Sequence, residues 1–337
     1  MPALHAIQHR AGYIDRALIP TIADAFNQTV SEIHGVITFY KDFRTDKPAG
    51  PIVQVCRAEA CQARGGRDVW DRAQRSAHGK PVVVEEVFCL GNCATGPAVA
   101  VDGRLHGAVT PKTIDTIIGD AIARKTPSPT PATSGSGVTV YVPRDAAALA
   151  AGANDVAAEL SKTDGVRVVR NGSRGMLWLE PMIEVETPEG RIAYGPVSAK
   201  DVKGLLKSGL LEGGQHKLRL GRTEDLDWMK RQQRITYQRV GVVDPRSADD
   251  YEAHRGIAGL RRALSMTPAQ VVQEVTDSGL RGRGGAAFPT GIKWKTVLEA
   301  QASQKYIVCN ADEGDSGTFA DRMLMEGDPF MLLEGMT

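Results

Sequence analysis

Four cysteines gather in one short stretch of the chain and could together hold a metal centre. The spacing is Cys-x4-Cys, then 27 residues, then Cys-x3-Cys, and the ligands would be Cys56, Cys61, Cys89 and Cys93. Only five cysteines occur in 337 residues, so random placement would rarely produce this cluster. In a reducing compartment, clustered cysteines more often bind metal or perform redox chemistry than form disulfides. Because iron accepts soft thiolate ligands, we predict a [2Fe–2S] cluster and a protein that passes single electrons.

Two other interpretations of the same residues stay open. Four thiolates also make a structural zinc site, and the spacing within each pair suits zinc. Disulfides or free thiols are the second alternative. The fifth cysteine, Cys309, lies alone in the apolar segment 306–309, and we expect it to be a small buried residue of a strand.

A glycine-rich run at 279–294 is the second feature that could do chemistry. Its Gly282-x-Gly284-x-x-Ala287 spacing resembles a dinucleotide fingerprint, but that fingerprint follows a strand, and here the segment from Thr267 predicts a helix. The run can still bind a phosphate, because clustered glycines expose backbone N–H groups. Positive charge is close by in the sequence, on Arg281, Arg283 and Lys293.

An acidic loop follows the apolar segment 306–309. Asp312, Glu313 and Asp315 place three carboxylates within four positions, after a predicted strand. Loops that follow strands are the usual ligand-binding loops of α/β sheets. Each of the two features could also be a plain surface loop, but together they favour a nucleotide site.

The elements that must position these residues occur twice in the same order. The first set is a strand (52–56), a helix (66–77), a strand (81–88), a hairpin (97–109) and a helix (114–123). The second set is a strand (138–142), a helix (146–160), a strand (166–169), a hairpin (182–197) and a helix capped by Ser198. This internal repeat predicts two thioredoxin-like α/β domains, of which only the first has cysteines. Each cysteine pair follows a strand, so both pairs can reach the same end of one sheet.

The predicted organisation has five parts. They are a helical segment at 1–45, a thioredoxin-like domain at 46–124, a Pro/Ser/Gly-rich linker at 125–137, a cysteine-free thioredoxin-like domain at 138–219 and a final part at 220–337. In the helical segment, Ile14, Leu18, Ile22 and Phe26 repeat at helical spacing.

Charge and hydropathy exclude two classes of partner. The chain has 41 basic and 40 acidic residues, so it carries no excess charge for nucleic acid or an anionic membrane. No apolar run approaches the roughly 20 residues that span a bilayer, and the N-terminus lacks the apolar core of a secretory signal. We therefore expect a cytoplasmic location.

At these residues the sequence resembles a known family. The four cysteines and Gly35-Val-Ile-Thr-Phe-Tyr resemble the 24-kilodalton [2Fe–2S] subunit of NADH dehydrogenase, respiratory complex I. Residues 279–294 and 306–322 resemble the FMN and NADH site of its 51-kilodalton partner. Together with 173–181 and 320–330, the chain looks closest to the diaphorase subunits of soluble, NAD-dependent, molybdenum-containing formate dehydrogenases.

This resemblance implies cofactors and the residues that bind them. FMN would be held by Gly282, Arg283, Gly284, Gly285 and Lys293, and Phe288 could stack on NADH. Asn310, Asp312 and Glu313 would line the flavin and nicotinamide side, and Asp315 lies where the family places an acidic NADH contact. Residues 220–337 would then be the start of an α/β FMN-binding domain. Because later parts of that domain are not in this sequence, we expect a truncated form.

The resemblance also implies partners, which would be a molybdenum-containing catalytic subunit and other iron–sulfur subunits. A diaphorase of an NAD-reducing hydrogenase or of NADH-quinone oxidoreductase is the alternative within the same class. A zinc-stabilised binding module is the alternative from another class.

Overall fold

The computed structural model describes residues 1–123, 137–315 and 317–337. The chain divides into two compact units, Met1–Pro127 and Ser128–Thr337. Except for Gly137, the predicted linker at 125–137 lies outside the described residues.

Three helices begin the first unit: α1 (Pro2–Ala11), α2 (Ile19–Ala25) and α3 (Val30–Phe39). Thr29 and Glu32 form a capping box that starts α3, in which each residue bonds the backbone N–H of the other. The series expected on one helix is only half correct, because Ile14 and Ile22 are buried while Leu18 and Phe26 are exposed. The reason is Pro20, which lies in the first turn of α2. A new helix therefore begins after Leu18, and the four residues do not lie on one continuous helix.

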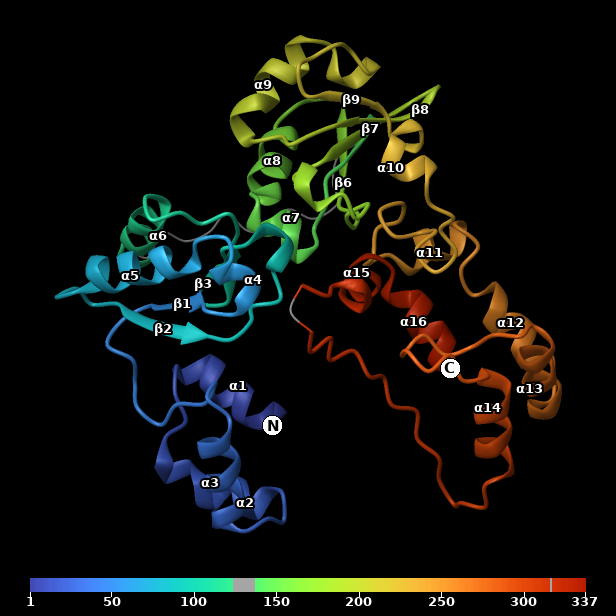
Figure 1. Cartoon of the computed structure of the whole chain (residues 1–337), viewed down its shortest axis with the longest axis horizontal. Coiled ribbons are helices and arrows are strands. Elements are labelled where there is room, and N and C mark those ends of the chain that lie inside the picture. Colours follow the sequence, from blue (N-terminus) through green and yellow to red (C-terminus); the bar gives the residue numbers. More distant parts are fainter. Residues whose placement is uncertain (124–136, 316) are drawn as a thin grey trace. The chain divides into compact units, whose positions relative to one another are not determined.

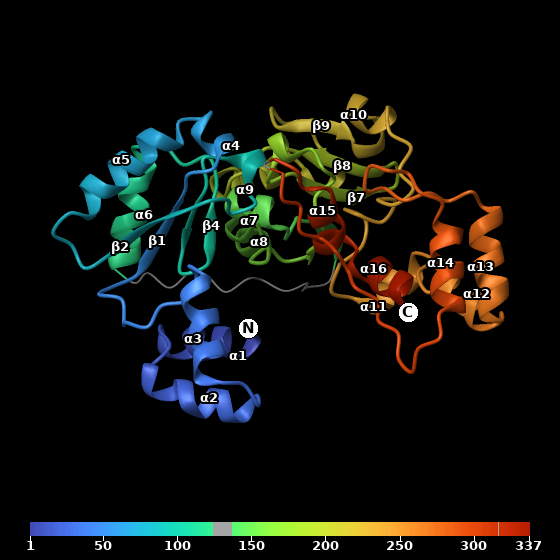
Figure 2. The same cartoon turned by 60° about the horizontal axis from the view of Figure 1, so that its bottom comes forward.

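A four-stranded sheet follows, in the order β2-β1-β3-β4 (Figure 1). Its strands are β1 (Ile52–Cys56), β2 (Val83–Val87), β3 (Val99–Val101) and β4 (Arg104–His106). β1 is parallel to β2 and antiparallel to β3. Helices α5 (Gly66–Ala77) and α6 (Thr113–Ile122) lie side by side on the sheet (Figures 1 and 2). Their apolar faces, with residues such as Val69 and Ile118, pack on Val53 and Val55 of β1.

The second unit repeats this topology, with the strand order β6-β5-β7-β8-β9. The strands are β5 (Val138–Tyr141), β6 (Val166–Val169), β7 (Ile183–Thr187), β8 (Gly190–Tyr194) and β9 (Arg219–Arg222). As in the first unit, a central strand pairs in parallel with the next strand and antiparallel with a hairpin. The structure thus confirms the predicted repeat and adds β9, which the sequence did not predict.

The helix predicted at 146–160 is two helices in the structure, α7 (Ala146–Ala150) and α8 (Ala153–Leu160). The break is at Gly152, whose φ of +102° is incompatible with a continuous right-handed helix. Helix α9 (Ala199–Lys207) starts at Ser198 as predicted, and Asp201 accepts a hydrogen bond from the Ser198 N–H.

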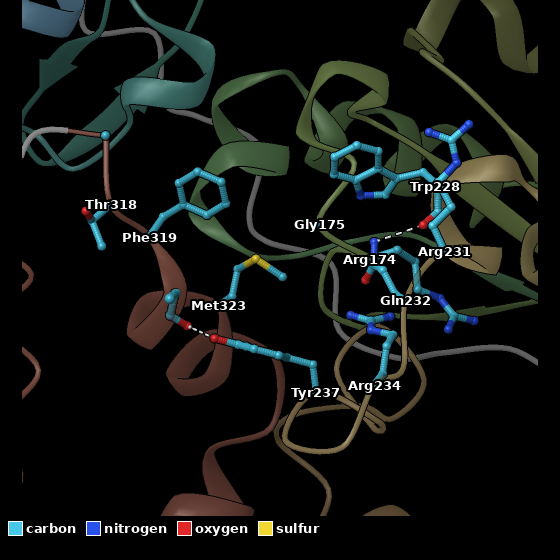
Figure 3. Close-up of a pocket in the computed structure, with 12 residues that line it drawn as sticks. Arg174, Gly175, Trp228, Arg231, Gln232, Arg234, Tyr237, Thr318, Phe319 and Met323 are labelled. Carbon is cyan, nitrogen blue, oxygen red and sulfur yellow. Dashed lines mark hydrogen bonds between the residues drawn. The ribbon is translucent and has the colours of Figure 1, made fainter. Parts of the chain in front are cut away.

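The regular structure described after β9 consists mainly of short helices. They are α10 (Asp227–Lys230), α11 (Ala248–Ala253), α12 (Ala258–Leu264), α13 (Pro268–Asp277), α14 (Thr290–Glu299), α15 (Ala320–Gly327) and α16 (Pro329–Met336). The predicted cap of α13 is confirmed, since the Thr267 hydroxyl accepts the Gln270 N–H. Helix α15 packs on the loop after β6, where Met323 lies against Gly175 (Figure 3).

The strand predicted at 306–309 is wrong. Tyr306, Ile307 and Val308 are 75%, 67% and 83% exposed, and Cys309 is exposed as well. A strand needs a neighbour for its backbone N–H and C=O groups, and among the described residues after β9 none pairs with this segment. The prediction that Cys309 is buried fails for the same reason.

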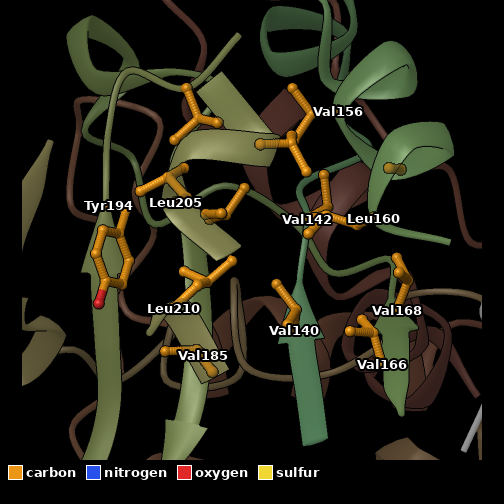
Figure 4. Close-up of a cluster of buried hydrophobic side chains, with 14 of the residues drawn as sticks. Val140, Val142, Val156, Leu160, Val166, Val168, Val185, Tyr194, Leu205 and Leu210 are labelled. Carbon is orange, nitrogen blue, oxygen red and sulfur yellow. The ribbon is translucent and has the colours of Figure 1, made fainter. Parts of the chain in front are cut away.

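The core of the second unit lies between its sheet and α8 and α9 (Figure 4). Val140 and Val185 of the sheet contact the same apolar cluster as Leu160 of α8 and Leu205 of α9. Tyr194 belongs to this cluster and is fully buried, and its hydroxyl donates to the Gly214 carbonyl at 2.7 Å. The helices are therefore fixed on the sheet by apolar burial, and the tyrosine's polar atom has a partner.

The buried carboxyl group of Glu180 should make the second unit less stable as the pH rises. Burial, followed by the charge of Asp145, raises the pKa of Glu180 to about 8 from an ordinary value of 4.5. Between these two pH values the folded state keeps a proton that the unfolded chain releases, so the free energy of unfolding falls as the pH rises.

We expect Glu180→Gln to remove most of this decline, because glutamine does not ionise. The measurement is urea unfolding at pH 5 and pH 8, followed by the fluorescence of Trp178. Glu189→Gln, at an exposed position, is the control and should keep the decline. An unchanged decline in Glu180→Gln would show that another group is responsible.

Candidate redox site

The four clustered cysteines meet at one end of the first sheet, as predicted. Cys56 is the last residue of β1 and pairs in register with Val87, the last residue of β2. The chain leaves both strands at this edge because they are parallel. Cys61 then lies on the short helix α4 (Glu59–Gln62), and Cys93 begins a 3-10 turn, Cys93–Thr95.

The cysteines form an inner and an outer pair. Cys56 and Cys61 are each 1% exposed, whereas Cys89 is exposed and Cys93 is partly exposed. The Sγ atoms of the outer pair are 3.7 Å apart. The inner pair is packed closely, since a Cβ added to Gly96 would lie 3.2 Å from the Cys61 Sγ.

Backbone N–H groups point at the sulfurs. The Gly91 N–H donates to the Cys89 Sγ at 3.2 Å, and the N–H groups of Ala58 and Leu90 approach Cys56. Glycine and asparagine tolerate the positive φ that a ligand loop commonly needs, and Gly91 and Asn92 lie in this loop. Gly91 has a positive φ (+66°), but Asn92 has a φ of −113°, and Cys89 itself has a φ of +120°.

The two thiols of the inner pair shift each other's pKa in opposite directions. The Cys61 thiol donates to Cys56, which is the main reason that the pKa of Cys56 is lowered to about 6, although burial opposes this. Donating that hydrogen bond, together with burial, raises the pKa of Cys61. Burial is also the main cause that raises the pKa of Cys89. A positive metal centre would favour the thiolate of all four cysteines.

Residues next to the cysteines in sequence carry buried polar atoms without partners, as expected where a sulfur-containing cluster accepts hydrogen bonds. Among the described residues, the buried Nδ2 of Asn92, Oγ1 of Thr95 and Nε of Arg57 have no hydrogen-bond partner. Each belongs to a residue within two positions of a cysteine of the cluster. Buried donors of this kind are rare unless an acceptor is missing, and the sulfurs of a cluster would be acceptors.

Zinc and a [2Fe–2S] cluster place different demands on four thiolates. A zinc ion needs all four ligands at about 2.3 Å from one point. A [2Fe–2S] cluster has two irons and so places its four thiolates around a larger group.

The glycine-rich run forms a closed loop at the start of α14. The Gly282 N–H donates to the Phe288 carbonyl at 2.8 Å, and the Thr290 N–H to the Leu280 carbonyl at 2.9 Å. Lys293, in the first turn of α14, holds its Nζ 5.8 Å from the centre of the Phe288 ring. It also lies 3.8 Å from where a Cβ on Gly282 would be. Backbone N–H groups, a helix N-terminus and a lysine are thus collected at one place, which fits the phosphate of FMN.

The other members of the loop have different surroundings. Arg283 donates to the Arg281 carbonyl at 2.6 Å, and Gly285 has a φ of +105° that favours glycine. Gly284 has open space around the position of a Cβ, so a ligand could approach its backbone there.

The acidic loop is only partly available for a ligand. The Glu313 carboxylate accepts the N–H groups of Asp321 and Arg322 at 2.7 and 3.0 Å and so caps α15. Asn310 accepts the Asp312 N–H at 3.3 Å, and Asp312 and Asp315 are exposed. In the described residues no hydrogen bond or ion pair joins this loop to the glycine-rich run. The structure therefore brings Lys293 close to the glycine-rich run, and among the described residues no such contact joins that run to the acidic loop.

Sequence reasoning missed two sets of residues. The Asn92 side chain was not predicted as a donor, although its place directly before Cys93 could have marked it. The ion pairs of the buried Arg174, with the buried Glu184 carboxylate at 3.0 Å and the exposed Glu224 carboxylate at 3.2 Å, had no signal in the sequence, because these partners lie 10 and 50 residues away.

Two family models match separate parts of the chain. Residues 1–121 match the family model of the thioredoxin-like [2Fe–2S] ferredoxin, and residues 275–337 match that of the Nuo51 FMN-binding domain. A solved structure of an NAD⁺-reducing [NiFe]-hydrogenase in the H₂-reduced state has a TM-score of 0.52 and 20% identity. The match covers 99% of this chain and 41% of the hydrogenase chain. At this low identity the likeness is one of fold.

Two curated relatives match part of the chain at high identity. The NADP-reducing hydrogenase subunit HndC of Solidesulfovibrio fructosivorans is 58% identical over 107 residues, which are 32% of this chain and 22% of the relative. An NADH-quinone oxidoreductase subunit of Rhizobium meliloti is 50% identical over 103 residues, which are 30% of this chain and 24% of the relative. The chain thus spans about a quarter of the length of these relatives.

In the parts that the structure describes, no helix has both the length and the apolar character to cross a membrane. The homologues are subunits of NADH dehydrogenase or diaphorase type, which are oxidoreductases. The chain therefore contains a thioredoxin-like [2Fe–2S] ferredoxin domain and part of a Nuo51 FMN-binding domain, and it is homologous to subunits of NADH-quinone oxidoreductase and to the diaphorase subunits of NAD-reducing hydrogenases.

Proposed function

We propose that this chain is an electron-transfer (diaphorase) subunit that moves electrons between NAD(H), FMN and iron–sulfur clusters in the cytoplasm. The observation that carries the proposal is the meeting of four cysteines at one sheet edge, with buried donors that lack partners next to them in the sequence. FMN can exchange a hydride, which carries two electrons, with NAD(H) and can pass electrons singly to a [2Fe–2S] cluster.

The residues have separate tasks in this proposal. Cys56, Cys61, Cys89 and Cys93 hold the cluster, and the Gly91 N–H stabilises the charge on a cysteine sulfur. Lys293 and the N–H groups of Gly282, Gly284 and Gly285 bind the FMN phosphate, with Arg283 adding charge. Phe288 offers its ring to the nicotinamide nucleotide. Asn310, Asp312, Glu313 and Asp315 complete the flavin and nicotinamide side.

We further infer that the partner is the molybdenum-containing catalytic subunit of a formate dehydrogenase, together with other iron–sulfur subunits. The resemblance of residues 173–181 and 320–330 to diaphorases of that class supports this choice. The names of the relatives support the alternatives, a hydrogenase or a quinone oxidoreductase. Activity of the reconstituted protein with hydrogenase subunits but not with formate dehydrogenase subunits would decide against the formate assignment.

The flavin part of the proposal is tested with two neighbouring lysines. We expect Lys293→Gln to weaken FMN binding about tenfold, because a charge-assisted bond to phosphate is lost. Lys295→Gln is the matched control, since Lys295 is on the same helix and its Nζ lies 3.8 Å from Glu299. The measurement is the quenching of flavin fluorescence on titration of anaerobically purified protein. Equal affinity in both variants would contradict the assigned phosphate site.

A further inference from the structure

A cavity of about 610 Å³ in the second unit has three arginines on one side (Figure 3). They are Arg174, at the loop after β6, and Arg231 and Arg234, which follow α10. Thr318, Phe319 and Met323, at the start of α15, line the other side. The volume is typical of small-molecule and cofactor sites. None of the lining residues belongs to the set proposed for FMN and NAD(H).

Within the described parts of the chain, Arg234 has two guanidinium nitrogens without a hydrogen-bond partner. Its Nε and Nη1 are buried and, in the described residues, make no hydrogen bond. Arg174 differs, because Glu184 and Glu224 hold it in ion pairs. Burial and then the charge of Arg174 lower the pKa of Arg234, which indicates that its positive charge is disfavoured as the protein stands. An anion in the cavity would remove this cost, and a guanidinium binds phosphate through two parallel N–H groups.

The acidic groups near the cavity do not supply that anion. Glu184 and Glu224 bind Arg174, and Glu313 caps the N-terminus of α15. Burial and then the charge of Asp321 raise the pKa of Tyr237. The Tyr237 hydroxyl donates to the Ala320 carbonyl at 2.8 Å. The arginine side of the cavity therefore keeps an excess of positive charge from Arg231 and Arg234.

The walls beside the arginines are aromatic. Trp228 is 51% exposed but held in place, because its ring packs edge-on against Trp178 with 5.3 Å between ring centres. The Trp228 carbonyl also accepts the Gln232 side chain at 3.1 Å. A fixed, accessible indole next to unpaired guanidinium groups is suited to a ligand that has both a flat ring and a phosphate.

We propose that this cavity is a nucleotide-binding site, in which Arg234 and Arg231 bind the phosphate and Trp228 contacts the base. The proposal does not depend on the flavin or the cluster, because none of the residues that carry it is proposed to bind either group. A nucleotide bound there would contact both the thioredoxin-like part and helix α15.

The test uses AMP and inorganic pyrophosphate as probes, with calorimetry and tryptophan fluorescence of the whole chain as readouts. We expect AMP to bind with one site per chain, and Arg234→Gln to weaken it at least about tenfold. Arg234→Lys keeps the charge without the planar fork and should bind with intermediate affinity. Arg246→Gln, at an exposed arginine outside the cavity, is the control and should bind like the unchanged protein.

Each other outcome overturns the proposal. No saturable binding of AMP up to about 10 mM would mean that no nucleotide site exists there. Pyrophosphate binding without AMP binding would remove the role of Trp228 and the nucleotide class. AMP binding that Lys293→Gln abolishes and Arg234→Gln leaves unchanged would place the ligand at the glycine-rich run instead. Cluster and FMN contents, measured on the same samples, report separately on the proposed electron-transfer function.

Discussion

The Cys61→Ala substitution is expected to abolish the visible absorption of the first unit and to remove its iron and acid-labile sulfide. The unchanged protein, purified without oxygen, should hold about two irons and two sulfides per chain. Cys61 is 1% exposed, so neither water nor another side chain from the solvent can readily replace its thiolate. Alanine supplies no ligand, and an iron with an open position at a buried site is not retained.

The fifth cysteine provides the matched control. Cys309 is exposed and belongs to the other unit, so Cys309→Ala should keep the full iron and sulfide content. Full cluster content in Cys61→Ala, or an equal loss in both variants, would contradict the assignment of ligands. Zinc in place of iron in the unchanged protein would contradict the cluster itself. Urea unfolding of the second unit should be the same in all three proteins, which separates loss of the cluster from general misfolding.

The sequence could predict the edge at which the cysteines meet because local patterns determine it. Short apolar strands at 52–56 and 83–87 point their carboxyl ends the same way once a helix connects them, and each leads directly into a cysteine pair. The repeat was visible for a similar reason. Turn residues such as Gly103 and Gly190 occupy equivalent places in the two hairpins, and both have a positive φ.

Features that depend on long-range partners could not be predicted in the same way. The apolar run at 306–309 has the composition of a buried strand, but a strand forms only where a neighbouring strand is available. Likewise, Glu313 is expected to face a ligand from its place in the sequence, yet α15 presents two N–H groups that take its carboxylate. In both cases the local sequence pattern alone was not sufficient, because the presence or absence of a tertiary partner decided the structure.

The largest effect on stability is expected at Glu184, which is 1% exposed in the centre of the second unit. Its carboxylate lies 3.0 Å from Arg174 and 3.7 Å from Arg191. Burial alone would lower the pKa of Arg174, and the charges of Glu184 and Glu224 raise it instead. The arginine also packs closely against Gly241, where an added Cβ would clash with its Cδ, and its side chain is 4% exposed.

We expect Glu184→Gln to lower the free energy of unfolding of the second unit by up to about 3 kcal/mol, because it leaves the buried Arg174 guanidinium with the exposed Glu224 as its remaining ion-pair partner. Glu186→Gln, two residues along the same strand and exposed, should change it by less than about 0.5 kcal/mol. The measurement is urea unfolding at pH 6, followed by tryptophan fluorescence. If the cause is the weaker compensation of that charge, the double variant Arg174→Met/Glu184→Leu should regain most of the loss, since apolar side chains often replace a buried ion pair without cost. A double variant as unstable as Glu184→Gln would instead show that the carboxylate acts through its hydrogen bonds to the surrounding loops.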